Sequence, residues 1–280
     1  MSTLVRAARL FARPLLLAMP ARHRKRYARK LAAWLSRRAS DRLEPYPADG
    51  GVIHLNVAES PMMAMRAIGL YELEKRRFLR SILRPGAVFV DAGANKGDFS
   101  LLAAAAVEDK GRVIAVEPEP RNVSDLRRNL ALNRYSNVEI VEAALSDRDS
   151  SATLYLGDKS GFHTLKPGQP ERRAGELRVR TRRLDSIAVE LGVRRIDAVK
   201  IDVEGGEVEL IRGAQSAISS NPAIVMLIDL HPHLGADIDA LEAILTSFGF
   251  RFFAMHSPQR QLEHLPRRPS DVIARRTPAK

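Results

Sequence analysis

The segment Val88–Ser100, "VFVDAGANKGDFS", joins a short apolar run to a glycine-containing turn and to the start of a helical pattern. The apolar run ends at Asp91, and two glycines follow it at positions 93 and 97. A strand that leads through such a turn into a helix is the nucleotide-binding unit of doubly wound α/β proteins. The segment therefore predicts a strand, a ligand-binding turn and a helix.

The same turn argues against a dinucleotide as the ligand. The G-x-G-x-x-G fingerprint, placed on Gly93, would need glycines where Asn95 and Asp98 stand. The side chain of Asn95 crowds the place where the backbone must approach a pyrophosphate. Asp98 puts a negative charge at the start of the helix, where a bound phosphate would need positive potential. We therefore predict a ligand without phosphates. S-adenosylmethionine fits, since it combines an adenosine with a sulfonium, an ammonium and one carboxylate.

Strand and helix patterns alternate on both sides of this segment. Strand patterns occupy 87–91, 112–117, 137–143, 196–202, 222–229, 251–256 and 271–275. Such alternation is typical of a parallel sheet with right-handed crossovers. We predict an α/β fold with seven strands in a doubly wound order, whose ligands bind at the carboxyl ends of the strands.

Composition excludes several classes of function. The chain has no cysteine, which rules out disulfides, cysteine–zinc sites and a cysteine nucleophile. No apolar run approaches the roughly 18 residues of a membrane span. The net charge of +12 lies almost wholly in residues 1–40, which contain eleven Lys or Arg and no Asp or Glu. The remainder is close to neutral and has no global field for a polyanion.

Residues 1–45 are predicted to form a basic amphipathic, helical extension, and 46–280 the folded domain with an insertion at 151–184. Such a helix can lie on an anionic membrane with Trp34 at the interface, or it can pack on the domain. An organellar transit peptide shares the arginine-rich composition, whereas a signal peptide is disfavoured because Arg13 directly precedes a short apolar run. We expect a cytoplasmic protein, with peripheral contact at the inner membrane face as an open alternative.

Acidic residues at strand ends match the groups of S-adenosylmethionine. Backbone amides of the turn would hold the carboxylate, and Asp91 or Asp98 the ammonium. Glu117, at the end of the next strand, would accept both ribose hydroxyls. Ala143 and Ala144, at the end of the third strand, would face the adenine. Each acid alone has a second interpretation, as a helix cap or a surface charge.

The motifs together resemble the FkbM family of S-adenosylmethionine-dependent methyltransferases. They are "VFVDAGANKGDFS", "VIAVEPEPRNVSDLRRNLALN", "VEAALSD", "TRRLDSI" and "VKIDVEGGEVELIRGA". The resemblance covers roughly 85–255 and implies a class I methyltransferase core with an antiparallel last strand. It implies transfer to a hydroxyl of a sugar, glycolipid or polyketide-type natural product. The cofactor positions that it implies are Asp91, Gly93, Asn95, Gly97 and Glu117, while "SGFHTL" with His163 departs from the family pattern.

Three residues after the fourth and fifth strands are candidates for the chemistry. Alternation puts Lys200 and Asp202 on one face of their strand, so Asp202 points into the cleft as a base or as an orienting group for the acceptor. Glu204 follows at the start of a helix, and His231 follows the next strand as a second candidate base. Alternatively, both acids shape the turn and pair with Lys200, and the histidine is an ordinary loop residue. The three side chains could also bind a divalent ion, but without a tight ligand motif we predict no metal site.

Other functions stay open at this point. The basic arm could tether an RNA methyltransferase, the turn could serve an NAD-dependent oxidoreductase, and the chain could be a non-catalytic scaffold at a membrane. The insertion could act as a lid or contact an anionic acceptor through Lys159, Lys166, Arg172 and Arg173. We favour a small-molecule or glycan acceptor over nucleic acid.

Overall fold

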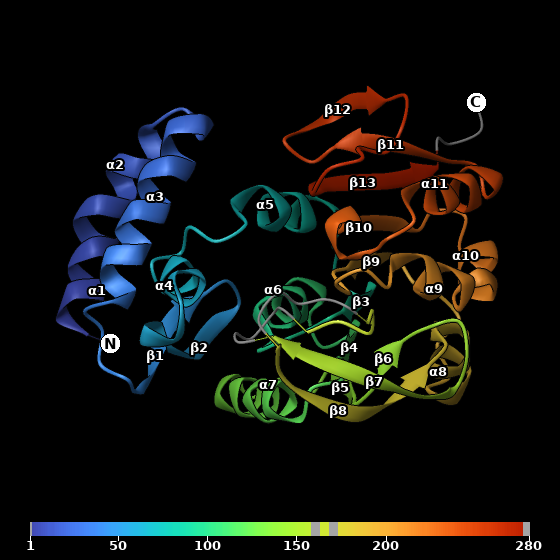
Figure 1. The fold of residues 1–280 in the computed structure, drawn as a ribbon, viewed down its shortest axis with the longest axis horizontal. Helices are drawn as coiled ribbons and strands as arrows, with labels where there is room; N and C mark the ends of the chain where they lie inside the picture. The colour runs from blue at the N-terminus through green and yellow to red at the C-terminus, as the bar shows by residue number, and fades with distance from the viewer. Residues whose placement is uncertain (1, 158–162, 168–172, 277–280) are drawn as a thin grey trace.

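The computed structural model describes residues 2–157, 163–167 and 173–276. An eight-stranded sheet lies at its centre in the order β12-β11-β13-β10-β9-β3-β4-β5 (Figure 1). The strands are β3 (Val88–Ala92), β4 (Arg112–Val116), β5 (Val138–Val141), β9 (Ala198–Ile201), β10 (Val225–Leu230), β11 (Phe250–Ala254), β12 (Ser257–Leu262) and β13 (Ser270–Arg276). Strands β10, β9, β3, β4 and β5 are parallel, and β13, β11 and β12 join as antiparallel neighbours.

This topology confirms the predicted fold class, including the antiparallel last strand. The sheet has one strand more than predicted, because Ser257–Leu262 pairs with β11 as an edge strand. Its sequence, "SPQRQL", lacks the apolar alternation that marks the other strands. An edge strand buries little surface, so the hydrophobic pattern gave no signal for it.

Helices cover both faces of the parallel strands. They are α5 (Leu73–Ile82), α6 (Asp98–Val107), α7 (Pro120–Asn133), α8 (Leu184–Glu190), α9 (Glu207–Arg212), α10 (Gln215–Ser220) and α11 (Ile238–Ser247). Phe89 of β3 packs in the apolar cluster that includes residues of α5 and α6, whereas Val90 packs in the cluster that includes α8 to α11. Successive side chains of a strand point to opposite faces, so a strand covered on both faces reads as a continuous apolar run.

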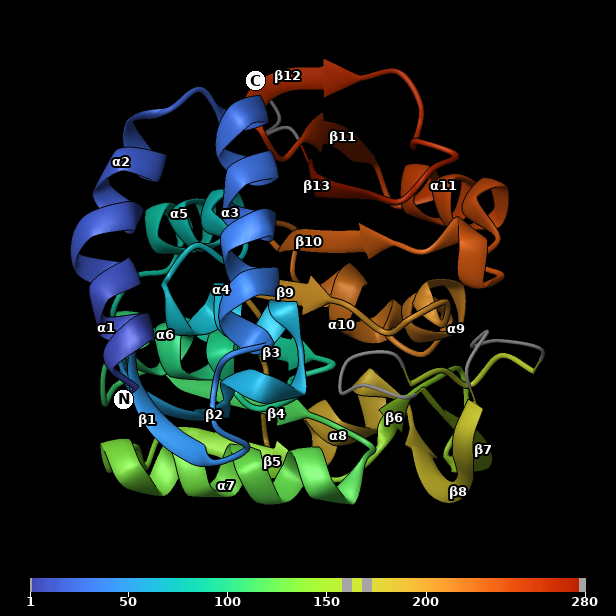
Figure 2. The ribbon, with the colours of Figure 1, turned by 60° about the vertical axis from the view of Figure 1, so that its left-hand side comes forward.

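The N-terminal arm is packed against the rest of the molecule (Figures 1 and 2). It consists of α1 (Thr3–Ala7), a π-helical turn (Ala8–Ala12), α2 (Arg13–Ala18) and α3 (Ala21–Ser36), and it lies beside α4 (Pro61–Ala67) and the hairpin β1 (Leu43–Ala48)–β2 (Gly51–Asn56). Ala28, Ala32 and Leu35 of α3 are buried. The Arg9 guanidinium donates hydrogen bonds to the carbonyls of Pro47 and Ala67, at 2.9 and 2.6 Å.

The structure between the arm and the central sheet differs from what the sequence predicted. The boundary predicted after residue 45 falls inside β1, and the segment 61–83 forms two helices, α4 and α5. Gly69, just after α4, has a φ of 70°, and Glu72, just before α5, has a φ of 48°. Both lie in the left-handed region, so the chain turns between the two helices. In the described part of the chain, no helix combines the length and the apolar character that a membrane span requires.

The insertion forms a small sheet of its own. Strands β7 (Ser150–Gly157) and β8 (Arg173–Arg182) are antiparallel, and β6 (Ala144–Leu145) runs parallel to β8. Thr164 bridges to Tyr155 and so returns the connecting segment to β7. Lys159 and Arg172 lie outside the described residues.

Candidate active site

A cavity of about 680 Å³ opens at the carboxyl ends of the parallel strands. Nine of the eleven residues that the sequence suggested for the cofactor or the chemistry line it: Gly93, Asn95, Asp98, Glu117, Ala143, Ala144, Asp202, Glu204 and His231. Asp91 and Gly97 are buried next to the turn and do not line the cavity. The fold therefore brings most of the predicted cofactor residues and all three predicted catalytic residues to one site.

The glycine turn is held against the loop after β9. Gly93 has a φ of 78°, and a Cβ atom at this position would lie 2.0 Å from the carbonyl oxygen of Asp202. Only glycine permits that approach. Asn95 is also left-handed, with a φ of 51°, a conformation that asparagine tolerates better than most residues. The two loops that carry the predicted cofactor and catalytic residues are thus in direct contact.

Glu117 is fixed by three protein donors. Its carboxylate accepts hydrogen bonds from the Asn95 and Glu119 amides, at 2.8 and 3.1 Å, and from the Asn122 side chain at 3.2 Å. A carboxylate has about four lone-pair positions, so roughly one remains for a ligand. Burial raises the pKa of Glu117 to about 7, although these three hydrogen bonds oppose the shift.

The two acids considered for the ammonium are both engaged by protein groups. The Asp98 carboxylate pairs with Arg66 at 2.8 Å and with Arg76 at 2.7 Å. Burial alone would raise the pKa of Asp98, but the two guanidinium groups outweigh it and lower the pKa. Asp91 accepts a hydrogen bond from the Ser100 hydroxyl at 2.7 Å, and burial raises its pKa. Asp98 therefore anchors the turn to α4 and α5.

Lys200 connects the turn to the loop after β9. Its ammonium lies 3.4 Å from the carboxylates of both Asp91 and Asp202, and it donates to the Gly93 carbonyl at 3.2 Å. Burial would lower the pKa of Lys200, but Asp202 and Asp91 raise it above its usual value. The sequence predicted that Lys200 and Asp202 share one face of the strand, and the ion pair confirms this.

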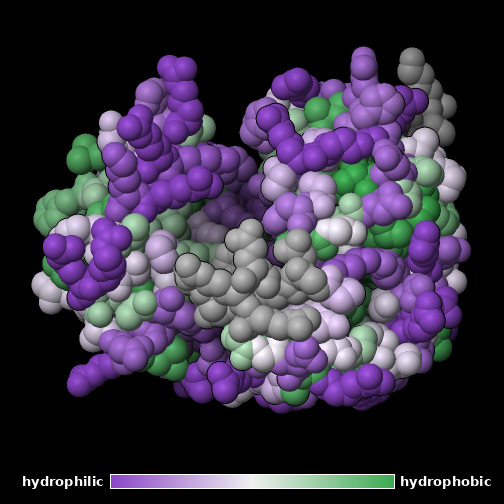
Figure 3. All heavy atoms as spheres, viewed as in Figure 1, coloured by the Kyte–Doolittle hydropathy of each residue, from purple (hydrophilic) through white to green (hydrophobic). Residues whose placement is uncertain are grey.

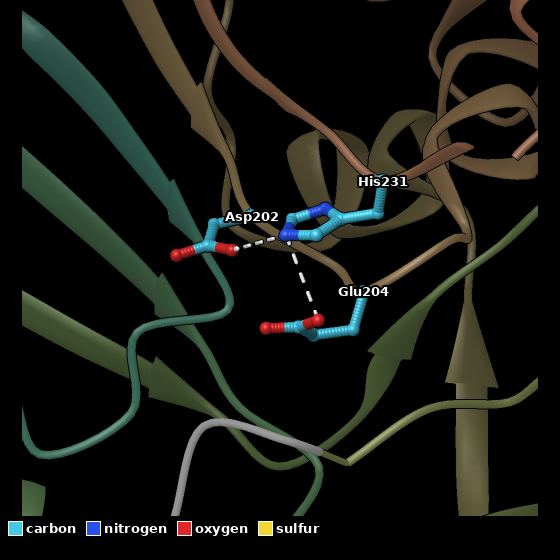
Figure 4. Close-up of side chains that lie close together, drawn as sticks. All are labelled: Asp202, Glu204 and His231. Carbon is cyan, nitrogen blue, oxygen red and sulfur yellow. Dashed lines mark ion pairs between the residues drawn. The ribbon is translucent and has the colours of Figure 1, made fainter. Parts of the chain in front are cut away.

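His231, Asp202 and Glu204 converge as Figure 4 shows. The His231 Nε2 atom lies 3.8 Å from Asp202 Oδ1 and 3.5 Å from Glu204 Oε2. On the other side of the ring, Nδ1 lies 2.8 Å from Oε1 of the fully buried Glu207. A carboxylate at Nδ1 fixes the neutral ring with its free nitrogen, Nε2, toward Asp202 and Glu204.

The protonation states of this group are shifted in different directions. Burial alone would raise the pKa of Asp202, but Lys200, Lys75 and His231 together lower it. Burial and the neighbouring Asp202 raise the pKa of Glu204. Burial would lower the pKa of His231, but its hydrogen bond to Glu207 and the nearby carboxylates raise it to about 9. At neutral pH Asp202 is ionised and His231 is mostly protonated.

A second buried charge cluster borders the cavity and was not anticipated. The Lys75 ammonium, 2 % exposed, contacts Asp229, lies 2.7 Å from Glu72 and lies 3.5 Å from Asp271. These groups join α5 to β10 and β13. Lys75 lies in a helix with many charged residues, outside the recognised motifs. Its burial results from contacts with residues that are distant in the sequence, so the local pattern could not predict it.

Three candidate metal ligands also meet here. One ligand atom from each of Asp202, Glu204 and His231 lies within 4.8 Å of the other two, so the group could hold an ion. The Lys200 ammonium already compensates the charge of Asp202.

Comparison with known proteins identifies the family. The FkbM methyltransferase domain matches residues 91–252. The chain belongs to the FkbM methyltransferase family. This family depends on S-adenosylmethionine, which confirms both the resemblance noted in the sequence and the predicted cofactor.

Individual relatives differ in how much of the chain they share. The 31-O-demethyl-FK506 methyltransferase FkbM of Streptomyces tacrolimicus is 28% identical over 76% of this chain and 90% of its own length. The 2-O-methyltransferase NoeI of Sinorhizobium fredii is 26% identical over 51% of this chain and 64% of its own. The AMB antimetabolite synthetase AmbE of Pseudomonas aeruginosa is 32% identical over 60% of this chain, which spans only 10% of that protein. The chain spans less than two thirds of the length of two of these relatives, NoeI and AmbE.

Proposed function

We propose that this protein transfers the methyl group of S-adenosylmethionine to a hydroxyl of a sugar, glycolipid or natural-product acceptor. The observation that supports this most directly is the contact between the cofactor turn and the catalytic loop at Gly93 and Asp202. It sets a donor site and a candidate base in one cavity, which is what an in-line transfer requires. Two relatives, FkbM and NoeI, carry O-methyltransferase names, which agrees with a hydroxyl acceptor.

We propose the following seating of the cofactor. The carboxylate lies against the Gly93–Gly97 turn, where it would have to displace a present acceptor, because each turn amide already donates within the protein. Glu117 accepts a ribose hydroxyl at its remaining lone-pair position. A second ribose hydroxyl would have to displace the Asn122 side chain, which makes the longest of the three contacts. Ala143 and Ala144 form an apolar wall for the adenine. Asp91 stabilises the turn from the protein interior, through its contacts with Ser100 and Lys200.

The chemistry divides between Asp202 and His231. When bound, S-adenosylmethionine would supply an electrophilic methyl group on its sulfonium and would leave as S-adenosylhomocysteine once the acceptor oxygen has taken that methyl. Asp202, ionised at neutral pH, accepts a hydrogen bond from the acceptor hydroxyl and orients it. The neutral form of His231 takes the hydroxyl proton at Nε2, because Glu207 holds Nδ1. Glu204 lies close enough to share that proton.

The decisive experiment incubates the protein with methyl-labelled S-adenosylmethionine and a panel of sugars, glycolipids and polyketide alcohols, and measures the label in each acceptor. We expect the wild type to label at least one acceptor. A His231→Gln variant should lose methyl transfer but still bind S-adenosylhomocysteine. A protein that binds NAD and not S-adenosylhomocysteine would contradict the proposal. Cofactor binding without transfer to any acceptor would favour the scaffold alternative.

We also propose that the arm touches an anionic membrane. Leu10, Phe11 and Leu15 are exposed by 60%, 72% and 68%, and they lie in a segment whose charged residues are all basic. An exposed apolar ridge flanked by cations fits the interface of an anionic bilayer. Trp34 is 38% exposed, and the Arg38 guanidinium lies over its ring at 4.6 Å.

A further inference from the structure

The cavity extends from the cofactor turn to a groove between the arm and the C-terminal strands. Figure 3 shows this hollow, with hydrophilic side chains on both walls. Lys25 and Arg29 of α3 line one wall, and Arg260 of β12 and Arg268 line the other. All four side chains are exposed while they border the cavity. We call these four residues the cationic rim.

The rim cations differ from those deeper in the cavity. Arg66 and Lys200 are buried, and each pairs with an aspartate. In contrast, none of the four rim side chains forms an ion pair with any residue that the structure describes. Their charge is therefore available to a ligand.

Packing of the arm fixes the first wall of the groove. Arg24 pairs with Glu74 of α5 at 3.1 Å, and Ala28 is buried, so α3 has a defined orientation. Lys25 and Arg29 are four residues apart and therefore lie on one face of this helix. Arg26 and Lys30, one position further along, have the same spacing but do not line the cavity.

The second wall is fixed in a similar way. The segment after β12 is tied to α11, because Glu242 accepts hydrogen bonds from the Leu265 amide at 2.8 Å and from Arg267 at 3.2 Å. Arg267 is thus used by the fold, whereas Arg268 next to it faces the cavity. Two independently anchored segments place unpaired cations across one groove.

We infer that the acceptor of this methyltransferase carries a phosphate or pyrophosphate group, which the cationic rim binds while the methylated hydroxyl reaches Asp202. This deepens the proposed function and rests on it. Four exposed cations around one opening match a ligand with several negative charges, since arginine and lysine are the usual partners of phosphate oxygens. The carboxylates of Asp202, Glu204 and Asp229 line the cavity and are buried or half-buried. Glu74 and Asp271 are more exposed, but they pair with Arg24 and Lys75. The anionic group therefore belongs at the rim and the neutral hydroxyl inside.

The test uses inorganic pyrophosphate as the probe and the full chain saturated with S-adenosylhomocysteine, which keeps the cofactor site occupied. Calorimetry at low salt compares wild type with Lys25→Gln/Arg29→Gln and with the matched control Arg26→Gln/Lys30→Gln. We expect the pyrophosphate dissociation constant to rise about tenfold in the first variant and to stay within about twofold in the control. An Arg260→Gln/Arg268→Gln variant should weaken binding to a similar degree.

The outcomes separate the inference from the function on which it rests. If S-adenosylhomocysteine does not bind, the proposed function fails. If it binds but pyrophosphate does not, or if rim and control variants weaken binding equally, the rim inference is overturned. The inference would also be overturned if a single-stranded RNA bound more tightly than pyrophosphate and if the rim variant of α3 and its control lost that RNA binding equally.

Competition then identifies the source of the phosphate. UDP and farnesyl diphosphate in micelles are titrated against bound pyrophosphate. The tighter competitor shows whether the acceptor is nucleotide-linked or lipid-linked. Failure of both to displace pyrophosphate would contradict an acceptor of either kind and overturn the inference.

Discussion

The Nδ1 atom of His231 lies 2.8 Å from Oε1 of Glu207, a carboxylate that is fully buried. This contact sets the orientation of the ring and helps raise the pKa of His231 to about 9. A base with that pKa is mostly protonated at pH 7, so transfer by the neutral ring should accelerate as the pH rises toward 9.

A Glu207→Gln variant tests this relationship. Glutamine can still accept the Nδ1–H hydrogen bond but has no charge, so the pKa of His231 should fall. We expect the rising limb of kcat/KM against pH to move to lower pH, with the maximal rate reduced about tenfold. An unchanged pH profile would show that His231 is not the base.

Substitution of Asp202 should separate chemistry from cofactor binding. Asp202→Asn keeps the size of the side chain but removes the negative charge that lies 3.4 Å from Lys200. We expect turnover to fall about a hundredfold, the scale of losing a positioned polar group in the transition state. The dissociation constant of S-adenosylhomocysteine should change less than threefold. Wild-type turnover would remove Asp202 from the mechanism.

Cofactor affinity should depend on pH through Glu117. Its pKa of about 7 means that the carboxylate is protonated below that value and ionised above it. The ionised form is the better acceptor for a ribose hydroxyl, so binding should tighten as the pH rises through 7. In Glu117→Gln we expect about tenfold weaker binding and no such pH step. The exposed Glu142→Gln is the control, and equal effects in both variants would disprove the ribose assignment.

Chelation tests the metal alternative. Lys200 already neutralises Asp202, so we expect methyl transfer to persist after treatment with EDTA and removal of the chelator. Loss of activity that Mg²⁺ or Mn²⁺ restores would instead assign Asp202, Glu204 and His231 as metal ligands.

Membrane contact is measured with vesicles. The full chain should sediment with phosphatidylserine-containing vesicles and much less with phosphatidylcholine alone. Leu10→Ser/Phe11→Ser/Leu15→Ser should reduce sedimentation at least fivefold, because it removes the exposed apolar ridge. The control Leu132→Ser changes an exposed leucine on α7, outside the arm. No preference of the wild type for anionic vesicles would reject the proposal.

The sequence by itself determined the parallel strands of the sheet, the turn and the class of cofactor. Strand periodicity, the two glycines of the turn and the acids at strand ends are local signals, and parallel strands bring their carboxyl ends together. For that reason the sequence alone places Glu117, Asp202 and His231 at one site.

Tertiary structure decided how these groups are charged and what surrounds them. Lys75 contacts Asp229, 154 residues away in the chain, and Asp98 pairs with arginines of α4 and α5. The arm closes one wall of the groove through Lys25 and Arg29. A pKa depends on burial and on charges within a few ångströms, and those neighbours come from distant parts of the sequence that no local pattern connects.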